Sequence, residues 1–178
     1  MPNWKIAEQQ TDQEDAVRLL IANYDQLGLP YPFHSLMLAI RYFLHNHTLL
    51  ICRDDQGNAA GVAGFGLGTE EDNYTDWSRI EIYTVFLLPE YRCTRLFLQG
   101  LRAVVKWMEE PGNASSLAFY LQPDHTTSKL FRKFTRVEKT VERTCGTLEL
   151  CTTELHELQD YLKTYNTNNE ATGSFTKE

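Results

Sequence analysis

The segment from residue 79 to residue 110 constrains the fold more than any other part of the chain. It opens with RIEIYTVFLL, an apolar run rich in β-branched and aromatic residues that is typical of a mostly buried strand and ends at Pro89. Beyond residue 92 the period becomes helical, because Leu101, Val105 and Met108 share one stripe. A strand, a tight turn and a helix N-terminus bring unpaired N–H groups and a positive dipole end together. The segment therefore predicts a phosphate site at the turn.

This segment resembles the central motif of the GNAT superfamily of N-acetyltransferases. In that family a strand runs through a turn similar to Pro-Glu-Tyr-Arg into Arg/Gln-x-x-Gly-x-Gly/Ala and a helix, and the turn holds the pyrophosphate of acetyl-CoA. The six corresponding residues here are RCTRLF, from 92 to 97, so Arg95 and Phe97 fill the two small positions. Glycine at such a site lets the backbone approach a phosphate, and a bulky side chain opposes that approach. The acetyl-CoA motif is therefore degenerate.

The resemblance implies which residues bind acetyl-CoA. Val85 and Leu87 match positions whose backbone groups pair with the pantetheine arm as if it were an extra strand, which requires this strand to splay from its neighbour near Pro89. The turn holds the pyrophosphate mainly through backbone N–H groups, with an added contact from the Arg95 side chain. The turn residues are Arg92, Cys93, Thr94, Arg95, Leu96 and Phe97.

A second stretch, residues 123–136, partly matches the family's Asn-x-x-Ala-x-x-Leu-Tyr-x-x-Leu-Gly-Phe motif. Asp124 stands for the Asn, and Phe131 replaces the Tyr that often protonates the departing CoA thiolate. Tyr120 or a water molecule is then expected to supply that proton. A CoA thiol with a pKa of roughly 8 to 9 needs little help.

Glu81 is an ionisable carboxylate in the middle of the apolar strand. Burial of an ionised carboxylate is unfavourable, so desolvation is expected to raise its pKa towards the range useful for deprotonating an ammonium group. It lies eleven residues before Arg92, similar to the spacing of the catalytic Glu in the histone-acetylating branch of the family. The alternative is a structural Glu that faces solvent at a strand end or pairs with Arg79 or Lys133.

Other features bear on the acceptor. In the related acetyltransferases the first helix, a loop and the second helix form one wall of the acceptor groove, so Tyr31, His34 and Tyr42 are candidates to face substrate. Aromatic residues at helical spacing more often belong to the core. The acidic loop of residues 69–76 either attracts a protonated amine or is simply solvated.

Composition excludes several classes of protein. The 178 residues are 42% hydrophobic and 23% charged, which fits one domain with a full core. The net charge is −7, and no block of five Lys or Arg occurs, so we expect no nucleic-acid partner. No apolar stretch is long enough for a signal peptide or a membrane span, so we expect no membrane partner and a cytoplasmic location.

The residue types that bind metals show no metal-binding spacing. The cysteines lack a Cys-x-x-Cys pair and are expected to be small buried hydrophobes, and His45 and His47 have no third ligand nearby. We therefore expect no metal, and the resemblance implies acetyl-CoA as the co-substrate. The glycines at 61, 64, 66 and 68 lie inside an apolar strand, which favours close strand packing over a nucleotide loop. The cysteines are Cys52, Cys93, Cys145 and Cys151.

The element order predicted from periodicity is β-α-α-β-β-β-α-β-α-β-β, the order of the GNAT fold. The first helix is expected over residues 12–26, with a capping box at residues 11–14, and a last helix over 153–162. The resemblance covers residues 5–150. It implies an α+β (mixed α/β) fold with a mostly antiparallel sheet, splayed at the cofactor strand, and helices on both faces. Residues 1–163 form a single domain, and the polar tail 164–178 is expected to be disordered.

Two functions remain open. The first is an acetyl-CoA-dependent N-acetyltransferase in which a primary amine, on a small molecule or a protein, attacks the thioester directly with Glu81 as general base. The second is a binding or structural protein that has kept the fold and lost the cofactor site. The replaced motif positions Arg95, Phe97, Phe131 and Thr135 favour the second. The amine, the acyl chain length and the oligomeric state, including a homodimer, are left open.

Overall fold

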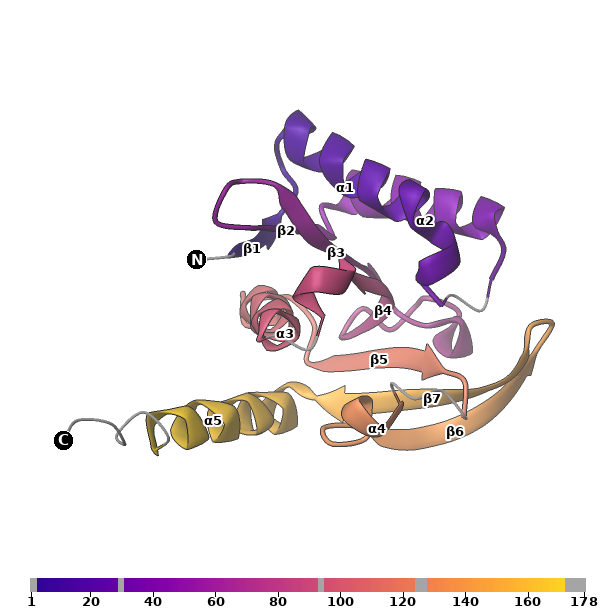
Figure 1. Ribbon diagram of the computed structural model, residues 1–178. Helices are drawn as coiled ribbons and strands as arrows, with labels where there is room; N and C mark the ends of the chain where they lie inside the picture. The colour runs from indigo at the N-terminus through magenta and orange to yellow at the C-terminus, as the bar shows by residue number, and fades with distance from the viewer. Residues whose placement is uncertain (1–2, 29–30, 93–94, 124–127, 172–178) are drawn as a thin grey trace.

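The computed structural model describes residues 3–28, 31–92, 95–123 and 128–171, the last seven of them and residues 128–129 as backbone. A seven-stranded sheet runs through it in the order β1-β2-β3-β4-β5-β7-β6 (Figure 1). The strands are β1 (Asn3–Ile6), β2 (Leu49–Arg53), β3 (Ala59–Leu67), β4 (Arg79–Leu87), β5 (Ser116–Leu121), β6 (Arg136–Arg143) and β7 (Gly146–Glu154). The helices are α1 (Gln10–Ala22), α2 (Phe33–Asn46), α3 (Leu96–Met108), α4 (Ser128–Phe131) and α5 (Leu155–Ala171). Single 3₁₀ turns are η1 (Tyr24–Gln26), η2 (Glu70–Asp72) and η3 (Pro89–Tyr91).

Strands β4 and β5 are parallel, whereas the other neighbouring strands are antiparallel. Their pairing spans residues 79–81 of β4 and 116–118 of β5. The register between β3 and β4 shifts after Gly64, which leaves Tyr83 as an extra residue in β4. Such a bulge bends its strand. Because β4 pairs with β5 only as far as Glu81, the predicted splay of the cofactor strand from its neighbour is confirmed. The splay begins at Glu81 and not near Pro89.

Helices cover both faces of the sheet, as predicted. Helices α1 and α2 lie side by side and pack on one face through a core that includes Leu20, Leu36 and Phe43 (Figure 1). Helices α3 and α5 pack on the other face through a core that includes Leu101 and Leu158. The α+β fold class with its mostly antiparallel sheet is confirmed.

The glycines of β3 let neighbouring groups approach the sheet closely. A Cβ atom on Gly64 would lie 2.4 Å from Cε2 of Phe43, and one on Gly66 would lie 2.8 Å from Cε2 of Tyr83. Real Cβ contacts are essentially never this short, so both positions require glycine, which has no side chain. The predicted role of this glycine series in close packing is confirmed.

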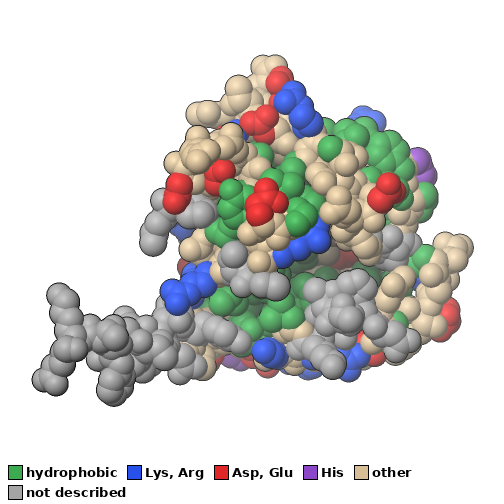
Figure 2. All heavy atoms as spheres, in the orientation of Figure 1, with side chains coloured by type: hydrophobic (Ala, Val, Ile, Leu, Met, Phe, Trp, Pro, Cys, Tyr) green, Lys and Arg blue, Asp and Glu red, His purple; other side chains and the backbone are tan. Residues whose placement is uncertain are grey.

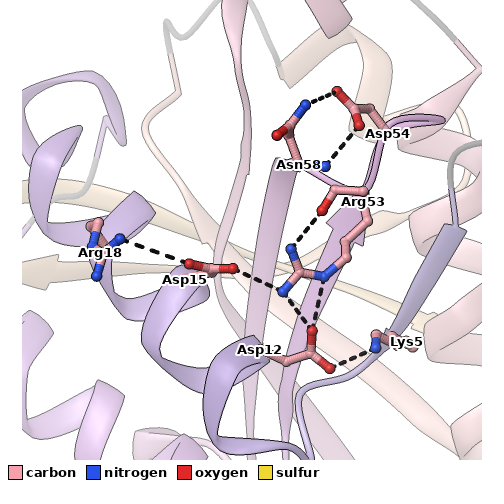
Figure 3. Close-up of polar contacts among 8 residues, drawn as sticks. Lys5, Asp12, Asp15, Arg18, Arg53, Asp54 and Asn58 are labelled. Atoms are coloured by element: carbon pink, nitrogen blue, oxygen red, sulfur yellow. Dashed lines mark hydrogen bonds and ion pairs between the residues drawn. The ribbon is translucent and has the colours of Figure 1, made fainter.

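The N-terminus of α1 differs from the prediction. The helix begins at Gln10, its N-cap is Gln9, and no side-chain cap is formed, so the capping box at residues 11–14 is wrong. The helix ends at Ala22 and is followed by η1. Asp12, expected to lie in that capping box, is instead buried beside Arg53 and Lys5 (Figure 3). A partner distant in the sequence has outweighed the local capping preference.

The cysteines follow the prediction only in part. Cys52 and Cys151 are buried as expected, whereas Cys145 is exposed, contrary to the expectation, and Cys93 lies outside the described residues. Helix α5 continues to Ala171, nine residues beyond its predicted end at 162, and the domain boundary at residue 163 stays a prediction. Within the described ranges, the helices are too short or too polar to span a bilayer.

Candidate active site

The gap between β4 and β5 exposes backbone groups of β4. The Leu88 N–H donates to the Ala60 carbonyl of β3 at 3.0 Å. Since backbone groups alternate in direction along an antiparallel strand, those of Val85 and Leu87 face away from β3, towards the gap. This is the orientation that their predicted pairing with a pantetheine arm requires. The Leu87 carbonyl already accepts a hydrogen bond from Arg92 Nε at 3.0 Å.

Glu81 is the last residue of β4 that pairs with β5. Its neighbours across the two strands are Gly66 and Ala118, so small residues flank it on both sides. Its exposure is 6%, and within the described part of the chain its carboxylate makes no hydrogen bond or ion pair. The predicted alternative of pairing with Arg79 does not occur, because Arg79 pairs with Glu138 at 3.1 Å.

The surroundings of Glu81 raise the pKa of its carboxyl group. Burial, the largest cause, and the nearby carboxylates of Glu70, Asp72 and Glu71 together raise the pKa of Glu81 to about 8, while Arg143 opposes them. A carboxyl group with a pKa near neutrality is half ionised near the working pH, which is the favourable range for general base catalysis. The expected direction of the pKa shift and its expected cause, desolvation, are both present.

Tyrosines surround this carboxylate. Tyr31, Tyr83 and Tyr120 all have pKa values raised above the ordinary one, first because they are buried and then because the charge of Glu81 is near. The Tyr31 hydroxyl donates to the Tyr83 carbonyl at 3.0 Å, which fixes Tyr31 against β4 at the bulge. Tyr74 carries a similar shift with the same two causes among others. All four stay protonated at neutral pH.

The sequence suggested some of these residues and missed others. Tyr31 was predicted as a candidate to face the acceptor, and it lies near Glu81. Tyr83 was missed, although it stands two residues after Glu81 in the same strand and alternation would place both side chains on one face. Tyr74 was also missed, because a loop residue carries no periodic signal. His34 is exposed on α2, and the Tyr42 hydroxyl accepts from the Leu67 N–H at 3.1 Å.

The acidic loop is tied to the β6–β7 hairpin. The Glu71 carboxylate pairs with both Lys139 and Arg143 and accepts from the Tyr120 hydroxyl at 3.4 Å. The Arg143 guanidinium also lies over the Tyr120 ring, 5.7 Å from its centroid. The Tyr120 hydroxyl is therefore engaged in an ionic cluster beside Glu81, and Glu71 is neutralised by its partners.

The other face of β4, towards α3, is filled by phenylalanines. The rings of Phe97 and Phe131 lie 5.6 Å apart, and those of Phe119 and Phe131 lie 4.8 Å apart, between centroids. The cavity left among them and Val85 has a volume of about 20 Å³. That space is enough for about one water molecule, which needs roughly 10–15 Å³ of such volume, but not for a pantetheine arm. Phe97 and Phe131 thus occupy the space under the gap.

The turn residues have partners of their own. The Arg92 N–H donates to the Pro89 carbonyl at 3.2 Å, and its guanidinium donates to Gln26 Oε1 at 3.3 Å as well as to Leu87. Arg95 is the N-cap of α3, and the carbonyl of the buried Leu96 accepts from the Trp4 indole at 2.9 Å. Cys93, Thr94 and Asp124 lie outside the described residues.

The site opens to the surface. Figure 2 shows a recess between the part of the molecule that carries α1 and α2 and the part formed by β5 to β7, at the level of the gap in Figure 1. Among the residues that the structure describes, no group of three or more His, Cys, Asp or Glu side chains is placed to hold a metal ion.

Comparisons with known proteins agree with this architecture. Neither a family model nor a curated protein sequence matches the chain. An N-acetyltransferase from Staphylococcus aureus Mu50 superposes with a TM-score of 0.63 at 17% identity, covering 87% of this chain and 99% of that one. Arabidopsis thaliana NAA60 with a bisubstrate analogue gives 0.61 at 13% identity, covering 86% and 98%. A chain of the NatC complex bound to Gag peptide and CoA gives 0.64 at 12% identity, also covering 86% and 98%. At these identities the likeness shows the fold, and the chain therefore has the fold of the GNAT N-acetyltransferases.

Proposed function

We propose that the protein is an N-acyltransferase that transfers an acetyl group from acetyl-CoA to a primary amine of a small molecule or a protein. The observation that carries the proposal is Glu81, a buried carboxylate without a partner among the described residues, at the point where β4 leaves β5. A buried charge without a partner destabilises the fold. An unpaired buried carboxylate is therefore a candidate for a role in ligand binding or catalysis. The solved NatC and NAA60 structures, which contain CoA and a bisubstrate analogue, support this assignment.

The residues of this chain would act as follows. The thioester supplies an activated acyl carbon. The Glu81 carboxylate accepts a proton from the acceptor ammonium, and the freed nitrogen bonds to the acyl carbon as the carbon–sulfur bond breaks. The nitrogen then releases its second proton, the thiolate takes up one proton by way of water, and Glu81 returns its own proton to solvent. Burial and the charges of Glu81 and Glu71 raise the pKa of Tyr120, which makes its hydroxyl a weaker acid than the sequence prediction assumed. Because the Tyr120 hydroxyl also donates to Glu71, water is the proposed proton source for the thiolate.

One observation favours the second candidate, a GNAT-fold protein that has lost the cofactor site. The backbone of Val85 and Leu87 fits a pantetheine arm, but Phe97 and Phe131 fill the space beneath the gap. The enzyme requires these rings to rotate or shift when acetyl-CoA binds. The inactive protein requires no movement. The two candidates therefore differ in whether the cofactor binds at all.

Calorimetric titration with acetyl-CoA, and with CoA as a product control, tests the proposal. The enzyme binds both with a dissociation constant in the micromolar range, a free energy of about −7 to −8 kcal/mol. Absence of heat at millimolar ligand contradicts the enzyme and leaves the second candidate. Location in the cytoplasm and assembly as a homodimer remain predictions.

A further inference from the structure

Tyr74, in the loop between β3 and β4, has an unfavourable backbone. Its φ is 57° and that of Asn73 is 55°, so two consecutive residues are left-handed. Asparagine tolerates this conformation, but for a bulky side chain it is an outlier that costs roughly 1–2 kcal/mol. The loop enforces it, because the Tyr74 N–H donates to the Thr69 carbonyl at 2.9 Å, and Thr69 and Asp72 form a reciprocal cap.

The fold gains little from the Tyr74 ring in return. The residue is 47% exposed, and its neighbour Trp77, whose indole N–H donates to the Tyr74 carbonyl at 3.1 Å, is 68% exposed. Glycine or asparagine at position 74 would suit the backbone better. Strain that the core does not repay is found most often at functional sites.

Tyr74 also lies near the Glu81 site, since a Cβ atom on Gly68 would lie 2.7 Å from the Tyr74 Cα atom. Glu81 pairs across the strands with Gly66, and a Cβ atom on Gly66 would meet the Tyr83 ring at 2.8 Å and the Tyr42 ring at 3.4 Å. Tyr74 interacts electrostatically with both Glu81 and Tyr83. Aromatic rings therefore continue from the buried carboxylate outwards to exposed Tyr74 and Trp77.

We propose that Tyr74 contacts the acceptor and selects a primary amine that carries an aromatic group, with Trp77 extending the same surface. The ammonium end reaches Glu81, and the aromatic group packs against Tyr74 outside it. Aromatic pairs contribute beyond their buried area and prefer such offset or edge-on contacts. This inference rests on the proposed function, since it names the acceptor class of that site.

The test compares 2-phenylethylamine with ethylamine as acceptors, with acetyl-CoA as donor. Wild type has the higher kcat/KM for 2-phenylethylamine. Tyr74→Asn lowers the ratio of the two kcat/KM values by about 3- to 10-fold, the worth of one aromatic pair. It lowers kcat/KM for ethylamine less than that for 2-phenylethylamine and does not lower the midpoint of thermal unfolding, because the backbone strain is relieved. Tyr74→Phe keeps the ratio. The matched control Asn73→Gly relieves the left-handed strain at the adjacent residue and changes kcat/KM for neither amine.

Several outcomes overturn the inference. Tyr74 is a structural residue if Tyr74→Asn leaves the ratio of the two kcat/KM values unchanged. The same holds if the variant has a lower unfolding midpoint and equal losses of kcat/KM for both amines. In either case the proposed function stands. Calorimetric titration with 2-phenylethylamine alone separates the two claims. Binding that Tyr74→Asn weakens, in a protein that binds no acetyl-CoA, supports the acceptor site and contradicts the transferase. Absence of amine binding and of turnover overturns both.

Discussion

Two buried carboxylates in this chain show how differently the same chemical group is used. Asp12 at the start of α1 and Glu81 in β4 are 2% and 6% exposed. Asp12 has cationic partners and a lowered pKa, whereas Glu81 has none among the described residues and a pKa raised to about 8. Burial therefore does not distinguish the structural carboxylate from the candidate base. The presence or absence of hydrogen-bonded cationic partners does.

Asp12 is held by a complete set of donors (Figure 3). Its Oδ1 accepts from Arg53 Nε at 2.9 Å and from Arg53 Nη2 at 2.7 Å, and its Oδ2 lies 2.6 Å from Lys5 Nζ. Burial by itself raises the pKa of Asp12, but the hydrogen bonds from Lys5 and Arg53 outweigh it and hold the pKa below its ordinary value. The network joins α1 to β1 and β2, so it stabilises the fold.

The largest effect is expected on stability, when Asp12 is replaced. Asp12→Asn leaves Lys5 and Arg53 without their shared carboxylate, and breaking a buried pair typically costs about 3 kcal/mol or more in the free energy of unfolding. Urea denaturation measures it. The matched control is Asp15→Asn, because Asp15 is 36% exposed and contacts the same Arg53 at 2.9 Å, and it should cost less than about 1 kcal/mol. Equal losses would show that Asp12 is not special.

Next in size is the effect of Glu81→Gln on turnover. Removing a general base lowers kcat by roughly 10²-fold, about 2.7 kcal/mol in the barrier, and the loss shrinks at high pH where the free amine is abundant. Steady-state kinetics with acetyl-CoA and an amine measure it. Glu8→Gln, at an exposed position, serves as the control and leaves kcat unchanged. A Glu81→Gln variant as fast as wild type would remove the base.

The two carboxylates also give opposite pH dependence of stability. The native state holds a proton on Glu81 that the unfolded chain has lost between pH 4.5 and about 8, so wild type loses stability as pH rises through that window. Glu81→Gln has no carboxyl group to titrate, so its stability should not fall over the same window. Glu70, Glu71, Asp72 and Arg143 face the same site and are unchanged in the variant.

Asp12 behaves in the reverse sense. Its native pKa is depressed, so its contribution is present above the ordinary value of 3.8 and is lost as pH falls through the native pKa. The deficit of Asp12→Asn is then constant near neutrality and shrinks in acid. Urea midpoints from pH 3 to pH 9 for both variants test the pair. Parallel curves would refute the contrast.

The smallest effect is expected on cofactor affinity. Phe97→Ala removes a ring from the space under the gap, so acetyl-CoA no longer has to displace it, and binding should tighten about five- to tenfold, or roughly 1 kcal/mol. Leu98→Ala on the same helix is the control, since Leu98 does not line the cavity. Weaker binding by Phe97→Ala would mean that the ring contacts the bound arm and does not block it.

Much of the fold was predictable because its signals are local. The strand that ends before Pro89, the helical stripe through Leu101 and Val105, and the hairpin glycines depend on residues near one another in the chain. Glu81 was found in the same way, as one charge in an apolar strand. Period and propensity act over a few residues, so one sequence is enough to read them.

Only the tertiary structure decided which residues meet. Asp12 is predicted by sequence only as a residue of the first helical turn, whereas its partner Arg53 is 41 residues away. The bulge at Tyr83 moves the splay to Glu81, and the packing of α3 and α4 brings Phe97 onto Phe131. The sequence by itself determined the elements and the candidate base. Long-range contacts determined the partners, because burial and pairing are properties of surroundings assembled from distant segments.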